Sequence, residues 1–194
     1  MKILLIDNYD SFTFNLVQLI GKNKLKFEII RNDEISVNDV KLVKPTKIII
    51  SPGPGRPEYS LLSLEVIKEF GKKIPILGVC LGMQAICQTF GAEIINSTQI
   101  YHGKTSPIKH NGKGIFSEIP QEFEAMRYHS LIVKRNTLPK EIEVTATTEH
   151  GIVMGIKHKK YPMDGIQFHP ESILTLAGKQ IINNWIEQDT FNRV

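Results

Sequence analysis

An uncharged stretch, Ile74–Ala92, constrains the fold of this chain more than any other part of its sequence. A membrane-spanning helix needs about 20 predominantly apolar residues, so the length alone would permit a span. However, Pro75, Gly78 and Gly82 interrupt the stretch, and such punctuation is typical of a strand, a turn and a helix. The sequence therefore predicts a buried strand–turn–helix unit of a globular sheet, with no membrane segment.

The first half of the chain alternates short β-rich runs with helical patterns. Strands are expected at Lys2–Ile6, Phe27–Ile30, Lys47–Ile50 and Ile74–Val79, and helices at Ser11–Ile20, Val37–Val43, Leu61–Phe70 and Leu81–Phe90. Strands that alternate with helices of this length indicate a parallel sheet with right-handed crossovers.

The second half is dominated by short β-like runs. Candidate strands are Phe123–Tyr128, Leu131–Lys134, Glu143–Thr147, Val153–Lys157 and Gly165–Phe168, and Leu174–Ile186 is expected to be a closing amphipathic helix. We predict an α/β fold: a three-layer sandwich with a mostly parallel central sheet, a nucleophile elbow and an antiparallel β extension at one edge. The chain reads as a single domain, residues 1–194.

Composition narrows the classes of partner and compartment. The net charge is +4, but the basic residues occur as scattered pairs such as Lys72-Lys73, which does not favour nucleic-acid binding. Cys80 and Cys87 would lie about 10 Å apart on one helix, too far for a disulfide. Free thiols favour a reducing compartment, and an acidic residue as early as Asp7 argues against a signal peptide. We therefore expect a cytoplasmic protein.

Cys80 is the candidate nucleophile. It stands between glycines, in Gly78-Val79-Cys80-Leu81-Gly82, where an apolar strand meets a helix, as in strained turns that lift a nucleophile above a sheet. A thiol attacks as the thiolate, and the N-terminus of the following helix favours that negative charge. A buried core cysteine is the alternative reading, and it is the one we expect for Cys87.

Two further segments supply the other groups that acyl transfer needs. The amide of Leu81 and that of Gly53, in the loop Ser51-Pro52-Gly53-Pro54-Gly55, could form an oxyanion hole, although the loop alone could be an ordinary turn. His169 and Glu171 stand two apart, so on an extended segment the carboxylate can orient the imidazole. The histidines lack the paired spacing of a metal site, and no metal is expected.

Together these segments resemble the class I, triad-type glutamine amidotransferases over nearly the whole chain. The resemblance rests on Gly78-Val79-Cys80-Leu81-Gly82-Met83-Gln84, Ser51-Pro52-Gly53-Pro54-Gly55 and Phe168-His169-Pro170-Glu171-Ser172. Within that class, Asp7-Asn8-Tyr9-Asp10-Ser11-Phe12-Thr13-Phe14-Asn15, His102-Gly103-Lys104-Thr105-Ser106, Arg127-Tyr128-His129-Ser130-Leu131 and Gly165-Ile166-Gln167 are similar to component II of anthranilate synthase and of aminodeoxychorismate synthase.

The resemblance implies a role for each of these groups. Cys80 would be the nucleophile, His169 the general acid and base, and Glu171 its orienting carboxylate, with oxyanion amides from Gly53 and Leu81. L-Glutamine would be held by Gly53, Pro54, Gly55, Gln84, Ser130 and Leu131. The protein would need no cofactor of its own.

The resemblance also implies a partner. Ammonia released into water becomes unreactive ammonium, so it should pass to a chorismate-using component I, whose own site takes Mg²⁺. We expect the interface near the mouth of the Cys80 site, at the Pro54–Tyr59 loop, the His102–Ser106 segment and Tyr128. Anthranilate and 4-amino-4-deoxychorismate synthesis remain equally open. The alternative function is an elbow-cysteine hydrolase or redox-sensing protein of the same fold.

Overall fold

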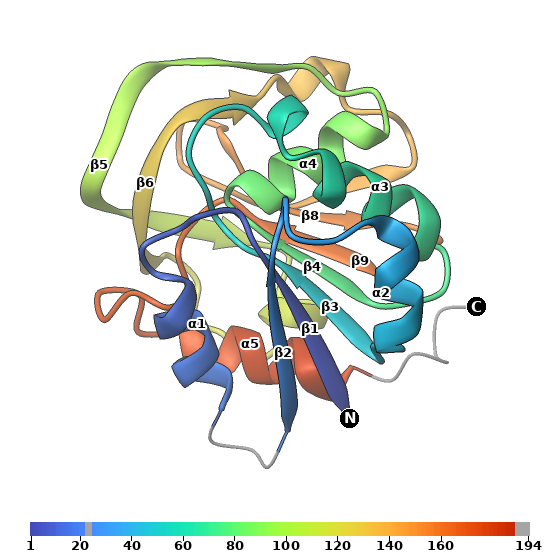
Figure 1. Cartoon of the computed structure of the whole chain (residues 1–194). Helices are drawn as coiled ribbons and strands as arrows, with labels where there is room; N and C mark the ends of the chain where they lie inside the picture. Colours follow the sequence, from blue (N-terminus) through green and yellow to red (C-terminus); the bar gives the residue numbers. More distant parts are fainter. Residues whose placement is uncertain (22–24, 189–194) are drawn as a thin grey trace.

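The computed structural model describes residues 1–21 and 25–188, whose strands form one nine-stranded mixed sheet with helices on both faces (Figure 1). The strands are β1 (Lys2–Asp7), β2 (Lys26–Arg31), β3 (Lys47–Ile50), β4 (Ile76–Val79), β5 (Ile94–His110), β6 (Phe123–Val133), β7 (Ile142–Thr147), β8 (Val153–His158) and β9 (Met163–Ile166). The α-helices are α1 (Thr13–Ile20), α2 (Val37–Val43), α3 (Leu61–Phe70), α4 (Leu81–Thr89) and α5 (Gly178–Glu187). Short 3₁₀ turns occupy Pro57–Tyr59, Gly114–Phe116 and Arg135–Thr137.

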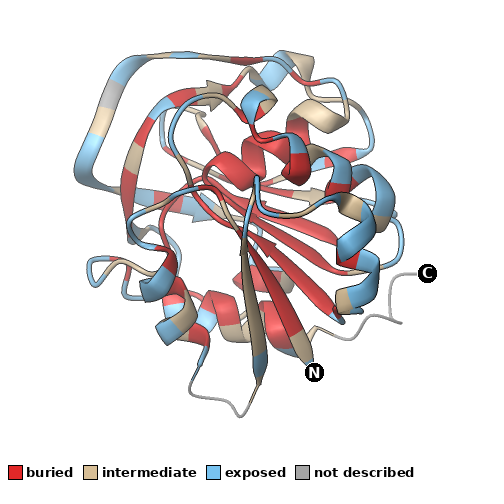
Figure 2. Ribbon diagram, in the orientation of Figure 1, coloured by how far each residue is buried: buried red, intermediate tan, exposed pale blue. Residues whose placement is uncertain are grey.

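The central strands are buried on both faces, which explains their nearly continuous apolar sequences (Figure 2). Alternate residues along each strand point to opposite faces. Ile3, Leu5 and Ile49 pack in one core with α1 and α5, whereas Leu4 and Ile48 pack in a second core with α2, α3 and α4. The two cores and the sheet between them give the predicted three-layer sandwich.

The strand order is β2-β1-β3-β4-β9-β8-β7-β5-β6. Strands β2, β1, β3, β4 and β9 run parallel, and β9 then pairs antiparallel with β8, which begins the antiparallel extension. Strand β9, the last in sequence within residues 25–188, therefore lies in the middle of the sheet, next to the strand that precedes Cys80. This placement brings the C-terminal part of the chain to the elbow.

The first-half elements agree with the sequence prediction to within two residues, and the first helix begins at Thr13 rather than Ser11. The second half departs more. The long strand Ile94–His110 was not predicted, and Phe123–Val133 is one continuous strand rather than two, because it pairs along most of its length with that unpredicted strand. The strand expected at Gly165–Phe168 lies at Met163–Ile166, since Gln167 and His169 leave the sheet to enter the site.

The last helix begins at Gly178, so the prediction of helix from Leu174 was wrong at its start. Residues after Glu171 instead form successive turns, in which the Thr175 amide donates to the Ser172 carbonyl at 2.9 Å and the Thr175 hydroxyl to the His169 carbonyl at 2.8 Å. These turns leave Ile173 and Leu176 each 88% exposed.

Gly178 packs directly against the segment that carries His169 and Glu171. A methyl group added at Gly178 would overlap the Pro170 carbonyl. Because this carbonyl belongs to the backbone, no movement of a side chain could relieve the overlap. Gly178, at the start of α5, thus fixes the position of Pro170, which links His169 to Glu171. Among residues 1–21 and 25–188, no helix is long and apolar enough to cross a membrane.

Candidate active site

The candidate active site lies at the carboxyl ends of four parallel strands. Asn8 follows β1, Ser51 follows β3, Cys80 follows β4 and Gln167 follows β9. Open α/β sheets bind their ligands at this edge, because loops from neighbouring strands converge there. Segments far apart in the sequence therefore meet around one cysteine.

Cys80 has the strained backbone expected of a nucleophile elbow, with φ of 52° and ψ of −102°. Its amide donates to the Ile166 carbonyl at 2.8 Å, which ties the turn to β9. The flanking glycines allow close packing: a methyl at Gly78 would overlap the backbone of Gly82, and one at Gly82 would overlap the Ile50 carbonyl. The prediction of a strained strand–turn–helix at Cys80 is confirmed.

His169 and Glu171 form a buried pair beside this elbow. Nδ1 of His169 lies 2.6 Å from Oε1 of Glu171, and the two side chains are only 3% and 2% exposed. Nε2 of His169 has no hydrogen-bond partner among the described residues. The backbone of His169 is held by β6, since its amide donates to the Met126 carbonyl at 2.9 Å. The imidazole is thus oriented by the carboxylate, with its second nitrogen left for chemistry.

Burial disfavours a charged His169, but its interactions with the nearby Cys80 and Glu171 outweigh burial and hold the pKa of His169 well above its usual 6.5. A protonated imidazole next to a thiol is the arrangement that activates cysteine nucleophiles. The site can therefore store the proton that a leaving amine requires.

This pair makes stability depend on pH. Because folding raises the pKa of His169, its contribution is complete below about pH 6.5 and is lost as the pH rises through the raised value. We expect Glu171→Gln to lower that pKa, so that the melting temperature of the variant falls less than that of the wild type between pH 6.5 and pH 9. Glu187→Gln, at an exposed site on α5, is the control. If the melting temperatures of wild type and Glu171→Gln fell equally between pH 6.5 and pH 9, this coupling would be contradicted.

A cavity of about 150 Å³ adjoins the cysteine on one side. It is lined by Gly53, Pro54, Gly55, Cys80, Leu81, Gln84, Tyr128, His129, Ser130 and Leu131. The structure thus brings together in one cavity all the residues that the sequence assigned to the oxyanion hole and to glutamine binding. Tyr128 and His129, which the sequence did not assign to glutamine binding, also line this cavity.

A second cavity, of about 270 Å³, lies on the side of Cys80 that carries His169. The loop after β1 supplies Tyr9, Asp10, Ser11 and Phe12 to its wall. Phe12 stacks on Tyr128 with ring centroids 5.7 Å apart, and Tyr128 in turn meets the edge of His169 at 5.3 Å. The sequence placed Tyr128 at a partner interface, but it gave no signal that this tyrosine would also contact the imidazole.

Asn8 joins the loops of this edge to one another, a role that sequence reasoning missed. Its amide donates to the Ser51 hydroxyl at 2.8 Å and its side chain to the Ser51 carbonyl at 3.0 Å. Its own side-chain oxygen accepts from Asn32 and Ser60. Asn8 is buried, so these bonds stabilise the position of the Gly53 loop. Only its place within the Asp7–Asn15 segment could have pointed to it.

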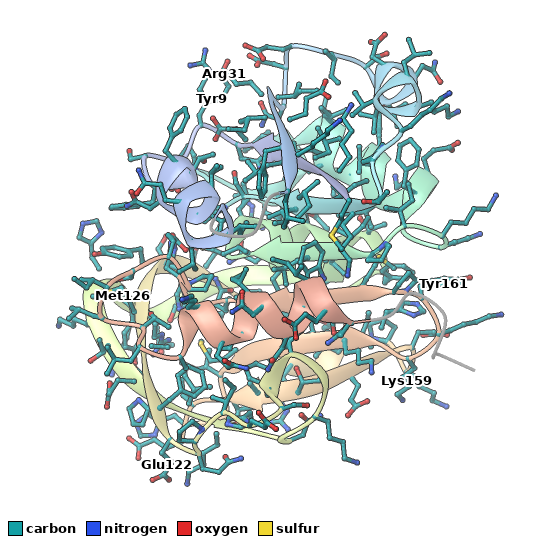
Figure 3. The ribbon with its side chains drawn as sticks, turned by 90° about the horizontal axis from the view of Figure 1, so that it is seen from below. Tyr9, Arg31, Glu122, Met126, Lys159 and Tyr161 are labelled. Atoms are coloured by element: carbon teal, nitrogen blue, oxygen red, sulfur yellow. The ribbon has the colours of Figure 1, made fainter. Side chains whose placement is uncertain are left out.

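Other candidate groups lie apart from this constellation. Cys87 is fully buried in α4, and burial raises its pKa to about 12, in keeping with a structural thiol. A larger cavity of about 550 Å³ is lined by Lys159 and Tyr161, which Figure 3 shows at the end of the molecule remote from Tyr9. It contains none of the three triad residues. No cluster of metal-binding side chains occurs within residues 1–21 and 25–188.

Comparison with known proteins agrees with this geometry. Aminodeoxychorismate/anthranilate synthase component 2 from Bacillus subtilis (strain 168) is 50% identical over 185 residues, 95% of this chain and 95% of that protein. The bifunctional protein TrpGD from Thermotoga maritima is 50% identical over 187 residues, so 95% of this chain spans only 32% of that longer protein. A crystal structure of a putative GMP synthase subunit from Thermoplasma acidophilum superposes with a TM-score of 0.84 at 26% identity, covering 96% of this chain and 92% of that one.

The family model of glutamine amidotransferase class-I matches residues 4–188, which include the elbow, the Gly53 loop and the His169–Glu171 pair. The chain therefore belongs to the class-I glutamine amidotransferase family.

Proposed function

We propose that this chain hydrolyses L-glutamine through a Cys80 thioester and delivers the ammonia to a chorismate-using partner subunit. One observation carries the proposal. The strained Cys80, the buried His169–Glu171 pair and the cavity lined by the Gly53 loop all lie at the same edge of the sheet. The product would be anthranilate, 4-amino-4-deoxychorismate, or both, depending on the partner. The name of the B. subtilis relative includes both activities.

In the proposed first step, the Cys80 thiolate attacks the side-chain carboxamide carbon of glutamine. The amides of Gly53 and Leu81 stabilise the resulting oxyanion. Protonated His169 gives its proton to the leaving nitrogen, so that the C–N bond breaks and ammonia and a glutamyl thioester form. A water molecule then gives a proton to neutral His169 and attacks the thioester, releasing glutamate and the Cys80 thiolate beside protonated His169. Glu171 holds the ring throughout.

The hydrogen bonds of Gln84 define how it would meet the substrate. Its Nε2 donates to the Leu131 carbonyl at 3.1 Å and to Oε1 of Gln167 at 3.0 Å, which uses both amide protons. Its Oε1 is then left to accept from the α-ammonium group of glutamine. The backbone of Ser130 and Leu131, on the same cavity wall, would bind the α-carboxylate.

The second cavity would give ammonia a way out on the His169 side. We propose that component I docks over this mouth, since solvent would convert ammonia to ammonium. Tyr59, in the predicted contact loop, is 77% exposed, as expected of a side chain that a partner covers. The turn after Glu171 adds Ile173 and Leu176, each 88% exposed.

This chemistry uses only the thiol, imidazole and carboxylate, so we assign this chain no cofactor of its own and expect Mg²⁺ in the partner. Both cysteines are free and buried, which supports a reducing, cytoplasmic compartment.

The test is glutamate release from glutamine by the purified chain, alone and mixed with component I of either synthase, with chorismate and Mg²⁺ present. We expect glutamate release to rise at least about tenfold with the matching partner, because docking shields the mouth and orders its loops. An ortho-amino or a para-amino product then identifies the pathway.

Two outcomes would contradict the proposal. Glutamate release that neither partner changes would remove the chorismate-linked role while leaving the glutaminase. No release under any condition would remove the glutaminase as well, and would favour a hydrolase or redox function for Cys80.

A further inference from the structure

A continuous chain of hydrogen bonds leads from β6 to the sulfur of Cys80. Nε of Arg127 donates to Nε2 of His129 at 3.0 Å, and Nδ1 of His129 lies 2.9 Å from the Leu131 carbonyl. The same carbonyl accepts from Gln84 at 3.1 Å. The chain continues from Gln84 to Gln167 at 3.0 Å and from Nε2 of Gln167 to Sγ of Cys80 at 3.4 Å.

The first member of this chain fixes the tautomer of His129. A guanidinium group has only donors, so Nε2 of His129 must be the unprotonated ring nitrogen. Nδ1 of His129 then carries the proton and donates it to the Leu131 carbonyl. Burial, followed by the charge of Arg127, lowers the pKa of His129 to about 4, so the ring stays neutral and keeps this tautomer near neutral pH.

The same reasoning orients the two amides. A carbonyl oxygen only accepts, so Gln84 must turn its Nε2 toward Leu131 and not its oxygen. The second proton of that Nε2 reaches the oxygen of Gln167, which leaves the nitrogen of Gln167 facing Cys80. The orientation of the Gln167 amide is therefore fixed by its neighbours.

Gln167 has no exposed surface, and Cys80 is only 5% exposed. Water therefore has little access to replace this donor. A hydrogen bond to a charged group is stronger than one between neutral groups, so the bond strengthens when the thiol loses its proton. The donor thus favours the nucleophilic form of the sulfur and holds it in one position over the cavity.

We propose that Gln167 is a further catalytic residue: its side-chain N–H is a fixed hydrogen-bond donor to the Cys80 sulfur, oriented by the hydrogen bonds that run from the Leu131 carbonyl through Gln84. The proposal deepens the proposed function, because it rests on Cys80 as the nucleophile. It assigns to the residue two positions before His169 a task distinct from those of the triad.

The test measures the thiol itself rather than turnover. Cys80 in wild type, Gln167→Met and Gln167→Asn is alkylated with iodoacetamide from pH 5 to pH 10 and quantified by mass spectrometry of its peptide. Methionine removes the donor at similar volume, and asparagine keeps an amide but shortens its reach. We expect the midpoint of the rate–pH profile to move upward in both, with alkylation at pH 7 about tenfold slower.

Two references accompany the variants. Gln180→Met makes the same change at an exposed site on α5 and should leave the profile unchanged. Buried Cys87 in each protein reports on unfolding, since it reacts only when the core opens. Comparable Cys87 protection shows that a variant is folded, and if Gln167→Met fails this check, Gln167→Asn decides.

An unchanged Cys80 profile in a folded variant would overturn the proposal, even if glutamine hydrolysis fell, because Gln167 would then act only on structure or substrate. The proposed function fails separately, through hydrolysis that survives loss of Cys80. The pH profile of Cys80 alkylation tests the role of Gln167 whether or not the proposed function holds.

Discussion

Cys80→Ala should lose at least about 10³-fold in glutamine hydrolysis while keeping the fold and its stability nearly unchanged. Alanine retains the Cβ of cysteine, so the backbone strain at φ 52° is the same in both proteins. The substitution removes the sulfur, with its 3.4 Å contact with Gln167 and its interaction with His169. Glutamate release with saturating partner, together with thermal melting, measures the two effects separately.

Cys87→Ala is the matched control, in the helix α4 that follows Cys80. That side chain is fully buried and lines neither of the cavities that adjoin Cys80, so its loss should lower stability by about 1 kcal/mol or more and leave turnover intact. Ammonium salts offered to the complex of Cys80→Ala should restore the aromatic product, because only the ammonia source is missing. Substantial glutamate release by Cys80→Ala would show that another group is the nucleophile.

Gly178→Ala should impair both stability and catalysis, although Gly178 touches neither substrate nor thiol. The added methyl overlaps the Pro170 carbonyl, so either α5 or the segment that carries His169 and Glu171 must move. Backbone overlap of this kind typically lowers stability by about 1–3 kcal/mol. A displacement of His169 near 1 Å lowers turnover by about 10²-fold.

Lys179→Ala, on the exposed next residue of α5, should change neither property. Steady-state kinetics with partner and chemical denaturation give the two readouts. The diagnostic result is a fall in kcat larger than the fraction of unfolded protein explains. If Gly178→Ala keeps wild-type kcat, the start of α5 does not position the pair.

The sequence was a good guide where local chemistry determines structure. The elbow could be predicted because glycines on both sides of Cys80 signal a tight strand–helix turn, and the parallel half because its apolar runs are short and regularly spaced. The long strand Ile94–His110 could not, since Gly103, Pro107 and several polar residues obscure any alternation, and its pairing with β6 stabilises it.

Contacts between distant segments account for what the sequence missed in the site. The sequence predicted most of the residues that line the cavity of about 150 Å³, but the contact from Gln167 to Cys80 and the bonds of Asn8 depend on which strands become neighbours. The helix expected from Leu174 fails for a related reason: Thr175 bonds back to His169, and this tertiary requirement overrides a helical pattern.

The central position of β9 has a consequence for synthesis on the ribosome. Strand β4 pairs with β3 on one side and β9 on the other, and β9 is the last strand to be made among the residues that the structure describes. A nascent chain that stops short of Met163 leaves the inner edge of β4 open, and an open apolar strand edge is a template for aggregation. The same chain holds Cys80 without His169 and Glu171, so its triad is incomplete. Closure of the sheet and assembly of the triad are thus one late event, and any appearance of activity during translation reports that β9 has inserted.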